Sequence, residues 1–470
     1  MPILPNSRSL TNIARHAVRG RNYKYPASKT ASTSFRLNNF PNTISRSLAC
    51  PASNMSLDPV YNLPNPGPLT EAQRGLIKAT VPLLEQSGVD ITRCFYKAML
   101  GANPDLKNVF SHTKQVKGDQ PEALARSVYA YAANIDDLTP VLPVVERLCH
   151  KHASLNILPQ QYTIVGKHLL EAITEIVGKD VFKGDLYDAW FAAYWQLAHI
   201  CINREAELYK AAAWVGWRDF VVRDKVHETD EITSFYLVPK DGGALPSYKP
   251  GQYISVQRFV DSLGFNQSRQ YSLSDAPNAD HIRISVRREN GGPNQEHPGC
   301  ISNLLHDGLK QGDTVEVAFP FGDFFLDEST SPVVLISAGV GLTPLTSMLH
   351  SIIASPSPRE VSWVQVVRSQ DKHALNEEVR NLLKQHPTPV RKTIFYSEPG
   401  SALQGEHYDI EGRMDLSKVD DLTLRLGESA QYYVCGPEQF MADMGKALLA
   451  KGVEHSRIHA EVFGAADVPI

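Results

Sequence analysis

The sequence lacks the features that would point to a zinc-finger, a disulfide-stabilised or a membrane-spanning protein. Its 470 residues include six cysteines, and no two of them form a Cys-x-x-Cys pair. This disfavours a zinc site and a disulfide framework and fits a reducing compartment. No apolar run is long enough to cross a bilayer, so no membrane-spanning helix is expected. The chain is also too long for one core and suits three domains.

Acidic residues are missing from the start of the chain. Eight Lys and Arg precede Asp58, the first acidic residue, and the remainder carries 39 basic against 51 acidic residues. An acidic body disfavours nucleic acid as a partner, because phosphate binding needs a cationic face.

The basic start has the composition of a targeting segment. Ser, Thr, Asn, Arg and Pro dominate it, and Leu10, Ile13 and Ala17 recur at helical spacing. This pattern is typical of a mitochondrial transit peptide, so residues 1–55 are predicted to engage the mitochondrial import machinery and to direct the protein to the matrix. The alternatives are a disordered basic tail and a cytoplasmic form that starts at Met55.

A Pro-rich linker is predicted at residues 56–68, and the pattern that follows is helical. Thr70 and Gln73 have the spacing of a capping box, Asp90 is expected to cap a second helix, and Gln120 with the proline after it to open a third. No strand pattern interrupts these helices, which predicts an all-α domain.

A histidine lies on the apolar stripe of the next predicted helix. Val141, Val145, Leu148 and His152 recur at spacings of four, three and four, whereas His150 points to a different face and is the weaker candidate. On spacing alone, such a histidine is more often a core residue than a metal ligand.

Two further polar residues share this placement and change that estimate. Tyr162 aligns with Leu169 on one helix, and Glu205 aligns with Cys201 on another. A buried carboxylate needs a partner, because an unpaired buried charge is costly, and Tyr162 and His152 are the natural candidates. A histidine oriented by a carboxylate through one ring nitrogen usually binds a metal through the other. His152 is therefore predicted to be a metal ligand.

Four motifs follow one another in the second half of the chain: Arg269-Gln-Tyr-Ser272, Gly339-Val-Gly-Leu-Thr-Pro344, Cys435-Gly-Pro437 and Glu461-Val-Phe-Gly464. Arg269 can bind a phosphate bidentately, while Tyr271 and Ser272 can present a ring and a hydroxyl to a flavin. The glycines follow an apolar run that predicts a buried parallel strand, and a helix is expected from near Thr343. Such a turn suits a pyrophosphate.

From residue 217 onward these motifs resemble the ferredoxin reductase family. Residues 69–209 resemble a globin, through Phe95-Tyr96, Phe110, Gln120, Lys151-His152 and the segment 202–209. A globin followed by such a reductase resembles the flavohaemoglobins, whose activity is nitric oxide dioxygenation. The resemblance implies a multidomain fold: an all-α globin domain at 69–213, an antiparallel β-barrel FAD domain at 214–330 and an α/β nicotinamide domain at 331–470.

The resemblance also implies roles for single residues. His152 is the expected ligand of the iron of haem b. Six further residues are the expected catalytic residues. Tyr162 and Glu205 would support that ligand, and Tyr96 and Gln120 would face the bound gas. Lys151 and Glu461 would lie between haem and flavin. The expected cofactor-contacting residues are Phe110 and Leu124 for haem, Tyr253, Arg269, Gln270, Tyr271, Ser272, Val462, Phe463, Gly464 and Ala465 for FAD, and Gly339, Val340, Gly341, Leu342, Thr343 and Pro344 for NAD(P)H.

The implied reaction converts NO and O2 to nitrate, with electrons passing from NAD(P)H through FAD to haem in a self-sufficient monomer. Two alternatives remain: an NAD(P)H-driven haem oxidase or reductase acting on oxygen or hydroperoxides, and a haem gas sensor or store.

The sequence departs from the family pattern in two places. Ala465 stands where other family members often have Pro. The loop from Arg288 to Gly299 leaves the choice between NADH and NADPH open, and Asn294, Gln295 and His297 unassigned.

Overall fold

The computed structural model describes residues 56–57, 61–278, 280–291 and 298–463. The expected transit peptide lies outside these ranges, as do Gly464, Ala465, Asn294, Gln295 and His297. From residue 56 onward the described residues belong to one compact unit, which contains separate helical, barrel and α/β cores.

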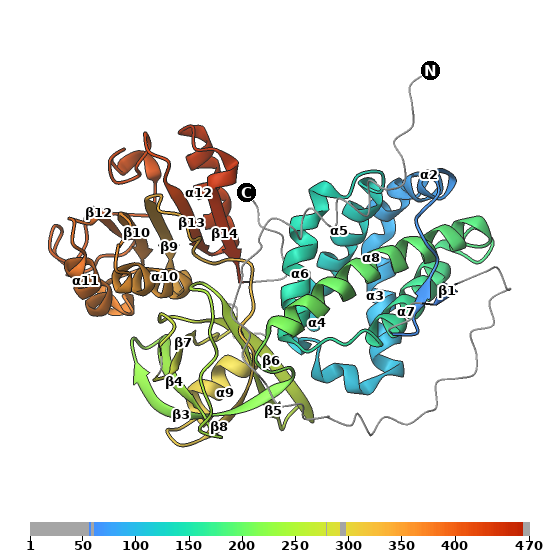
Figure 1. Ribbon diagram of the computed structural model, residues 1–470, viewed down its shortest axis with the longest axis horizontal. Helices are drawn as coiled ribbons and strands as arrows, with labels where there is room; N and C mark the ends of the chain where they lie inside the picture. The colour runs from blue at the N-terminus through green and yellow to red at the C-terminus, as the bar shows by residue number, and fades with distance from the viewer. Residues whose placement is uncertain (1–55, 58–60, 279, 292–297, 464–470) are drawn as a thin grey trace. The chain divides into compact units, whose positions relative to one another are not determined.

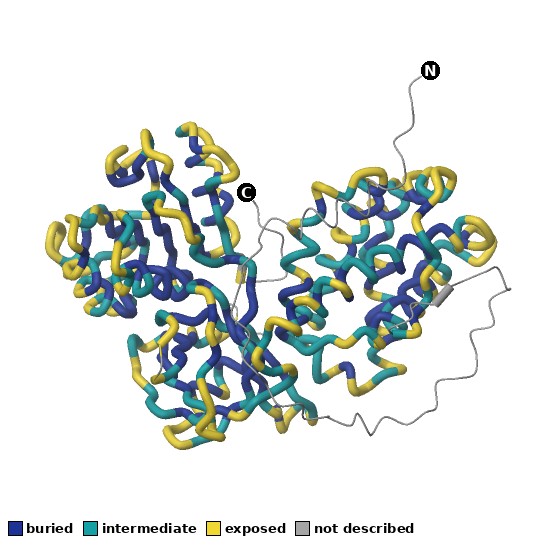
Figure 2. The backbone as a smooth tube through the Cα atoms, in the orientation of Figure 1, coloured by how far each residue is buried: buried dark blue, intermediate teal, exposed yellow. Residues whose placement is uncertain are grey.

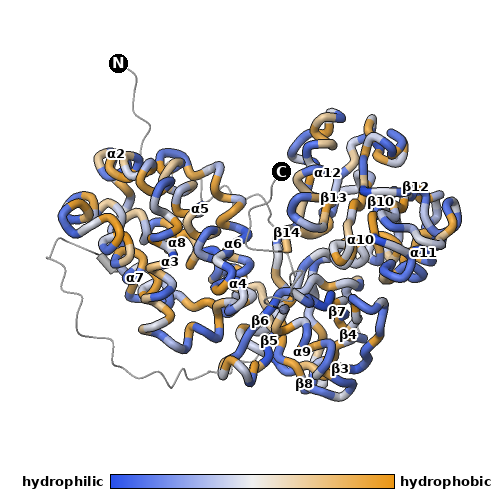
Figure 3. Tube along the Cα trace, turned by 180° about the vertical axis from the view of Figure 1, so that it is seen from behind, coloured by the Kyte–Doolittle hydropathy of each residue, from blue (hydrophilic) through white to orange (hydrophobic). Residues whose placement is uncertain are grey.

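Residues 69–213 contain only helices (Figure 1), as the all-α prediction requires. Hydrophobic and hydrophilic residues are interspersed along them (Figure 3), so that the longer helices bury one face, whereas the short helix from His112 to Lys117 buries no residue. The elements are α2 (Glu71–Ala79), α3 (Val81–Ala102), η1 (Pro104–Asn108), α4 (His112–Lys117), α5 (Asp119–Ala133), η2 (Thr139–Val141), α6 (Leu142–Ser154), α7 (Gln161–Val177) and α8 (Asp185–Ala211).

Two helix starts differ from their predictions, and one agrees. Thr70 and Gln73 form the expected capping box at α2. Asp90 caps nothing, because α3 runs through it and continues one apolar stripe from Leu84. Helix α5 begins one residue before Gln120, after a glycine in the left-handed region.

Part of the segment predicted as a linker packs on the globin helices. β1 (Ser56–Leu57) pairs with β2 (Pro64–Asn65). Leu63 is buried in one cluster with Trp195 of α8, and the backbone oxygen of Pro64 lies 2.8 Å from His199 Nε2.

The second core is a six-stranded antiparallel sheet in the order β6-β5-β8-β3-β4-β7. A bridge between Leu273 and Ile284 joins its edge strands and closes the sheet into a barrel around Phe220, Phe235 and Ile254. Its elements are β3 (Trp217–His227), β4 (Ile232–Pro239), β5 (Tyr253–Val260), β6 (Phe265–Ser272), β7 (Ile282–Arg287), α9 (Cys300–Gly308) and β8 (Thr314–Ala318).

The third core surrounds a parallel sheet in the order β12-β11-β10-β9-β13-β14. All six residues of β9 are buried, and the tube in Figure 2 shows the central strands of this sheet as mostly buried, as a sheet covered on both faces requires. Its elements are β9 (Val333–Ala338), η3 (Gly339–Gly341), α10 (Leu342–Ala354), β10 (Val361–Val367), η4 (Gln370–Lys372), α11 (Asn376–Gln385), β11 (Arg391–Tyr396), β12 (Ile410–Glu411), η5 (Leu416–Lys418), β13 (Gln431–Gly436), α12 (Glu438–Ala450), η6 (His455–Arg457) and β14 (Ile458–Val462).

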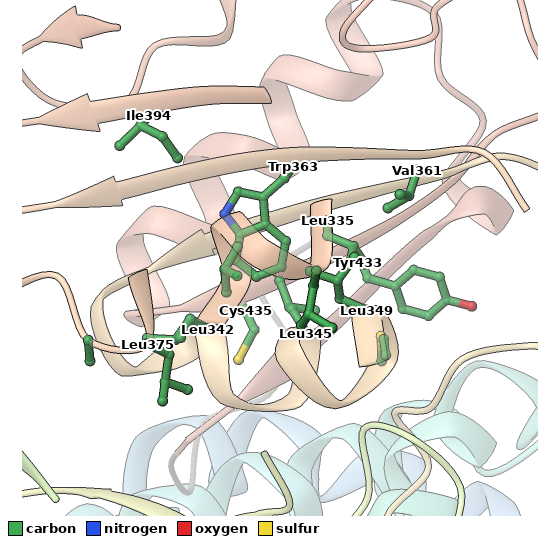
Figure 4. Packing of buried hydrophobic residues seen from close by; sticks show 14 of the residues in the cluster. Leu335, Leu342, Leu345, Leu349, Val361, Trp363, Leu375, Ile394, Tyr433 and Cys435 are labelled. Atoms are coloured by element: carbon green, nitrogen blue, oxygen red, sulfur yellow. The ribbon is translucent and has the colours of Figure 1, made fainter. Parts of the chain in front are cut away.

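Helices cover both faces of this sheet. On one face Trp363 of β10 shares a cluster with Leu345 and Leu349 of α10 (Figure 4). On the other face Met441 and Leu448 of α12 pack in a second cluster. Within the described ranges, no helix is both long and apolar enough to cross a membrane, and the cysteines at 94, 149, 201, 300 and 435 are unpaired.

The crossing of α7 and α8 depends on Gly166. A Cβ there would lie 2.4 Å from Cε1 of Tyr194, whose hydroxyl donates to the Tyr162 carbonyl at 2.5 Å. We expect Gly166→Ala to destabilise the globin domain by about 1–3 kcal/mol, because the ring must move. Gly101→Ala, where nothing lies within 4 Å, should change stability by about 0.5 kcal/mol or less. Thermal unfolding followed by circular dichroism measures both, and equal shifts in Tm would contradict the packing argument.

Candidate functional site

Helices α6, α7 and α8 bring three polar side chains together in the helical core. His152 Nδ1 lies 2.8 Å from Glu205 Oε1 and 3.0 Å from the Tyr162 hydroxyl, and that hydroxyl donates to the same carboxylate oxygen at 2.6 Å. Glu205 is 1% exposed. The buried carboxylate has therefore found the two partners that the helix periodicity predicted.

This triad decides the state of the His152 ring. Because a carboxylate oxygen accepts, Nδ1 carries the proton and Nε2 keeps its lone pair. Nε2 has no hydrogen-bond partner within the described ranges, and the ring is 26% exposed. The arrangement is that of a metal-binding imidazole oriented by a carboxylate.

His150 uses both of its ring nitrogens for other contacts. Nδ1 accepts from the Gly322 amide at 3.0 Å, and Nε2 lies 3.2 Å from Glu146 Oε1. Burial alone would raise the pKa of Glu146, but hydrogen bonds from His150 and from Arg204 hold that pKa at about 2. Residue spacing did not indicate this network, because Gly322 and Arg204 are distant from α6 along the chain.

A second set of predicted residues gathers around Tyr96 on α3. Its ring is 8% exposed and packs edge-on against Phe110, with centroids 5.6 Å apart, and Leu124 packs against the same cluster. Burial raises the pKa of the Tyr96 phenol, so the group stays protonated, and its hydroxyl donates to no other described residue. Gln120 accepts from Gln115 through Oε1 at 2.8 Å. The Tyr96 hydroxyl is therefore available to donate a hydrogen bond to a bound ligand.

These residues fit a haem better than a bare metal ion. Within the described ranges, no three His, Cys, Asp or Glu side chains are placed to hold a metal. A metal bound by His152 must therefore bring its other ligands, as an iron porphyrin does.

The predicted flavin residues occupy neighbouring strands of the barrel. In the register of β5 and β6, Tyr253 lies opposite Ser272, and Val256 opposite Arg269. Because side chains alternate along a strand, Gln270 and Ser272 share a face with Tyr253, while Arg269 and Tyr271 lie on the other. Burial lowers the pKa of Arg269; among the described residues its guanidinium donates only to the Ser268 carbonyl, at 2.6 Å, and forms no ion pair with a carboxylate. This group is available to a phosphate.

The predicted nicotinamide residues lie at the carboxyl end of β9. Gly339 has a φ of 54°, and a Cβ at Gly341 would lie 2.2 Å from the Cys435 carbonyl oxygen. Helix α10 starts at Leu342, slightly before the expected position, and the hydroxyl of Thr343 donates to Val340. The turn lies between β9 and β13, where the sheet order reverses and ligands of such sheets bind. Pro344 is buried in this first turn of α10.

The last motif reaches the same edge from β14. Glu461 pairs with Cys435 in the parallel register, and Phe463 is 47% exposed. Burial raises the pKa of the Glu461 carboxyl to about 8; Asp323 adds to this shift, and Arg147 and Lys151 oppose it.

Lys114 on α4 was not predicted from the sequence, and its charge interacts with two residues that were, Lys151 and Arg269. Burial, and to a smaller extent the charges of Lys151 and Arg269, lower its pKa to about 7. Burial also lowers the pKa of Lys151. None of the three cations forms an ion pair within the described ranges, so together they favour an anionic ligand.

Several hydrogen bonds join the barrel to the globin core, and two of them lie close to the predicted site residues. Gln267 Nε2, two residues before Arg269, donates to the Phe110 carbonyl at 3.1 Å. On the other side Gly322 donates to His150, and its neighbour Phe321 exchanges two backbone hydrogen bonds of 2.9 Å with Tyr253. Strand β6 therefore contacts the segment next to Tyr96 directly, and β5 is connected to helix α6 through the Phe321–Gly322 segment.

Comparison with known proteins agrees with this architecture. The globin family matches residues 93–201, and the oxidoreductase NAD-binding domain family matches residues 335–446. The flavohemoprotein of Bordetella parapertussis is 48% identical over 408 residues, covering 85% of this chain and 100% of the relative. That of Rhizobium meliloti is 46% identical over 403 residues, covering 84% and 98%.

A solved structure is similar over the same length. The crystal structure of flavohemoglobin from Malassezia yamatoensis with bound FAD and heme matches with a TM-score of 0.74 and 29% identity, covering 84% of this chain and 100% of that one. With the matching domains and relatives of nearly full length, the chain belongs to the flavohaemoprotein family, as a globin joined to an FAD- and NAD-binding oxidoreductase.

Proposed function

We propose that this flavohaemoprotein is an NAD(P)H-dependent nitric oxide dioxygenase. It converts NO and O2 to nitrate, using haem b and FAD, and acts as a self-sufficient monomer in NO detoxification. The observation that carries the proposal is the triad at His152: its Nε2 lone pair is free, and its Nδ1 is held 2.8 Å from a buried carboxylate.

The cofactors supply the electron transfer and the gas-binding metal: FAD divides the electron pair of NAD(P)H into single electrons, and haem iron accepts them and binds a diatomic gas. His152 would hold the iron, and Glu205 with Tyr162 would keep its ring in one tautomer and make it a stronger electron donor. The Tyr96 hydroxyl would donate a hydrogen bond to the partly negative oxygen of a ligand in the pocket. Arg269 would hold the FAD phosphate, and the turn from Gly339 to Pro344 the nicotinamide phosphates.

The complete reductase distinguishes this proposal from a gas sensor or store, which needs no electron supply. An oxidase or hydroperoxide reductase would use the same residues, so only the substrate separates it from a dioxygenase. The direct experiment measures NO consumption by the purified full chain with NADH and with NADPH, in air and under nitrogen. NO loss that needs both O2 and NAD(P)H, with nitrate as the product, supports the proposal. If the rate of NAD(P)H oxidation does not change when NO is added, the oxidase is favoured.

The Tyr96 hydroxyl provides a test of the distal side. We expect Tyr96→Phe to keep its full haem content, because only a hydroxyl is lost. A hydrogen bond to a charged acceptor is worth about 1.5–3 kcal/mol, so O2 should dissociate about ten- to a hundred-fold faster. Stopped-flow O2 dissociation measures this. An unchanged rate would mean that the hydroxyl does not contact the bound gas.

Arg269 provides a test of the flavin side. Arg269→Ala should release FAD and leave the haem spectrum intact, because the barrel and the globin have separate cores. Arg287→Ala is the matched control, since this barrel arginine is 42% exposed and lies at the end of β7. The ratio of flavin to haem absorbance after gel filtration gives the result, and full FAD occupancy in Arg269→Ala would refute the assignment.

We also propose that residues 1–55 direct import into the mitochondrial matrix. The support is their eight basic residues without an acidic one. A protein that starts at Met55 retains Leu63 and the globin contacts of the Pro64 segment, so we expect it to bind haem and FAD with full turnover. In cells it should stay in the cytoplasm, whereas the full chain should reach mitochondria; fractionation of both forms measures this. Loss of haem binding would instead assign the segment to the globin.

A further inference from the structure

A bidentate ion pair joins the barrel core to the α/β core. Arg283 of β7 donates to both carboxylate oxygens of Glu378 on α11, from Nη1 to Oε2 at 2.7 Å and from Nη2 to Oε1 at 2.6 Å. The arginine is 2% exposed, and the side chain of Glu378 is 28% exposed. A planar guanidinium that meets a carboxylate through two parallel bonds holds one relative orientation. The two cores are therefore fixed against each other at this point.

Arg283 also holds the segment that follows the predicted flavin residues. Its Nε donates to the Ser274 hydroxyl at 3.0 Å, and its Nη2 donates to the Ser274 carbonyl at 2.6 Å. Ser274 is two residues after Ser272, the last residue of β6. With a longer bond of 3.4 Å from Nη1 to the Tyr236 hydroxyl, Arg283 uses all five of its N–H groups. The arginine therefore has no donor left for a bound ligand, and its contacts hold these segments together.

Helix α10, which begins at the predicted nicotinamide turn, is bonded to the same segment. The hydroxyl of Ser347 donates to the Asp275 carbonyl at 2.5 Å. One helical turn later on α10, His350 Nε2 lies 2.6 Å from Glu378 Oε1, and its Nδ1 lies 3.6 Å from Asp275 Oδ1. The residues that follow β6 thus contact both α10 and α11, which pack in one cluster of the α/β core.

The partners of Glu378 keep it charged. Burial alone would raise the pKa of this carboxyl, but hydrogen bonds from His350 and from Arg283 hold the pKa at about 2. Removal of one partner would leave the other charge buried and unpaired, which is costly. The ion pair between Arg368 and Glu231 also joins the two cores, but the side chain of Arg368 is 50% exposed, and exposed pairs contribute little. The buried pair therefore carries most of this connection.

We propose that Arg283 and Glu378 are positioning residues of the reductase, which hold the nicotinamide domain in the orientation that lets NAD(P)H reduce the flavin. In that step a C–H bond of the dihydronicotinamide breaks, and the hydride forms a new bond to the flavin with both electrons, so that NAD(P)H becomes NAD(P)⁺ and FAD becomes FADH⁻. Hydride transfer needs donor and acceptor in contact, and a displacement of about 1 Å can cost about a hundred-fold in rate. The proposal rests on the proposed function only for electron transfer from NAD(P)H to FAD, and not for NO as the substrate.

The kinetic test compares two isosteric changes in the full chain loaded with haem and FAD. Glu378→Gln removes a charge from the pair that joins the two cores. Glu360→Gln is the matched control, because Glu360 also accepts from a buried arginine, Arg425, but both residues belong to the α/β core. Anaerobic stopped-flow absorbance measures flavin reduction at increasing concentrations of NADH or NADPH, whichever reduces the parent faster.

The expected difference lies in the limiting rate of flavin reduction. It should fall by about ten- to a hundred-fold in Glu378→Gln, while FAD content and the dissociation constant of the nicotinamide stay close to those of the parent. Glu360→Gln should keep the parent rate. A parent rate in Glu378→Gln, or an equal loss in both variants, would overturn the proposal.

Hydrogen exchange followed by mass spectrometry tests the contact without turnover. The amides of α11 and of the segment after β6 should exchange faster in Glu378→Gln than in the parent, because these segments lose a shared partner. The globin helices should exchange at the parent rate. Unchanged exchange in both segments would contradict the positioning role.

Arg283→Lys keeps the test open if Glu378→Gln does not fold. The lysine keeps the positive charge, but one ammonium group cannot replace a guanidinium that bonds Ser274 and Glu378 at once. Flavin reduction should therefore slow by about ten-fold or more, and a parent rate would count against the proposal. A chain whose flavin reduction depends on Glu378 but which consumes no NO would disprove the dioxygenase and leave the positioning role standing.

Discussion

The helical core depends on one buried carboxylate. Glu205 is 1% exposed on the long helix α8, and it would be costly there without partners. Its Oε1 accepts from His152 on α6 and from Tyr162 on α7, while Oε2 has no partner in the described part of the chain. One oxygen thus fixes three helices relative to one another, sets the tautomer of the histidine and leaves Nε2 as the only nitrogen available to a metal.

The strands that carry the predicted flavin residues, β5 and β6, are positioned by a few local hydrogen bonds. Strand β5 carries Tyr253, which is held by two backbone hydrogen bonds to Phe321, and the next residue, Gly322, donates to His150. Strand β6 carries Arg269, and its Gln267 donates to the Phe110 carbonyl beside Tyr96. Both strands are therefore connected to the segments that flank the predicted haem site by hydrogen bonds that join a side chain of one domain to a backbone group of the other. Because a backbone group is the same in every residue, one partner of each contact leaves no trace in the sequence.

The sequence predicted those features that follow from periodicity. Apolar stripes placed His152, Tyr162 and Glu205 on inward faces, and a buried carboxylate then required a partner, so the triad could be predicted from residue spacing and the cost of burying a charge. Asp90 failed as a helix cap because capping is worth only about 1 kcal/mol, and the apolar stripe that continues through α3 outweighs it. Lys114 and the contact of His150 with Gly322 could not be predicted, because they arise where distant segments meet.

The two histidines of α6 show why helical phase decides between candidates that are two residues apart. Such residues point about 160° away from each other, so one faces the helical core and the other faces the barrel. His150 is the more buried of the two, at 6% exposure, and burial alone would have favoured it as a ligand. Its two nitrogens are used by Glu146 and Gly322, however, whereas His152 is oriented through one nitrogen and keeps the other free. The unused lone pair, and not the depth of burial, is therefore what makes His152 the predicted metal ligand.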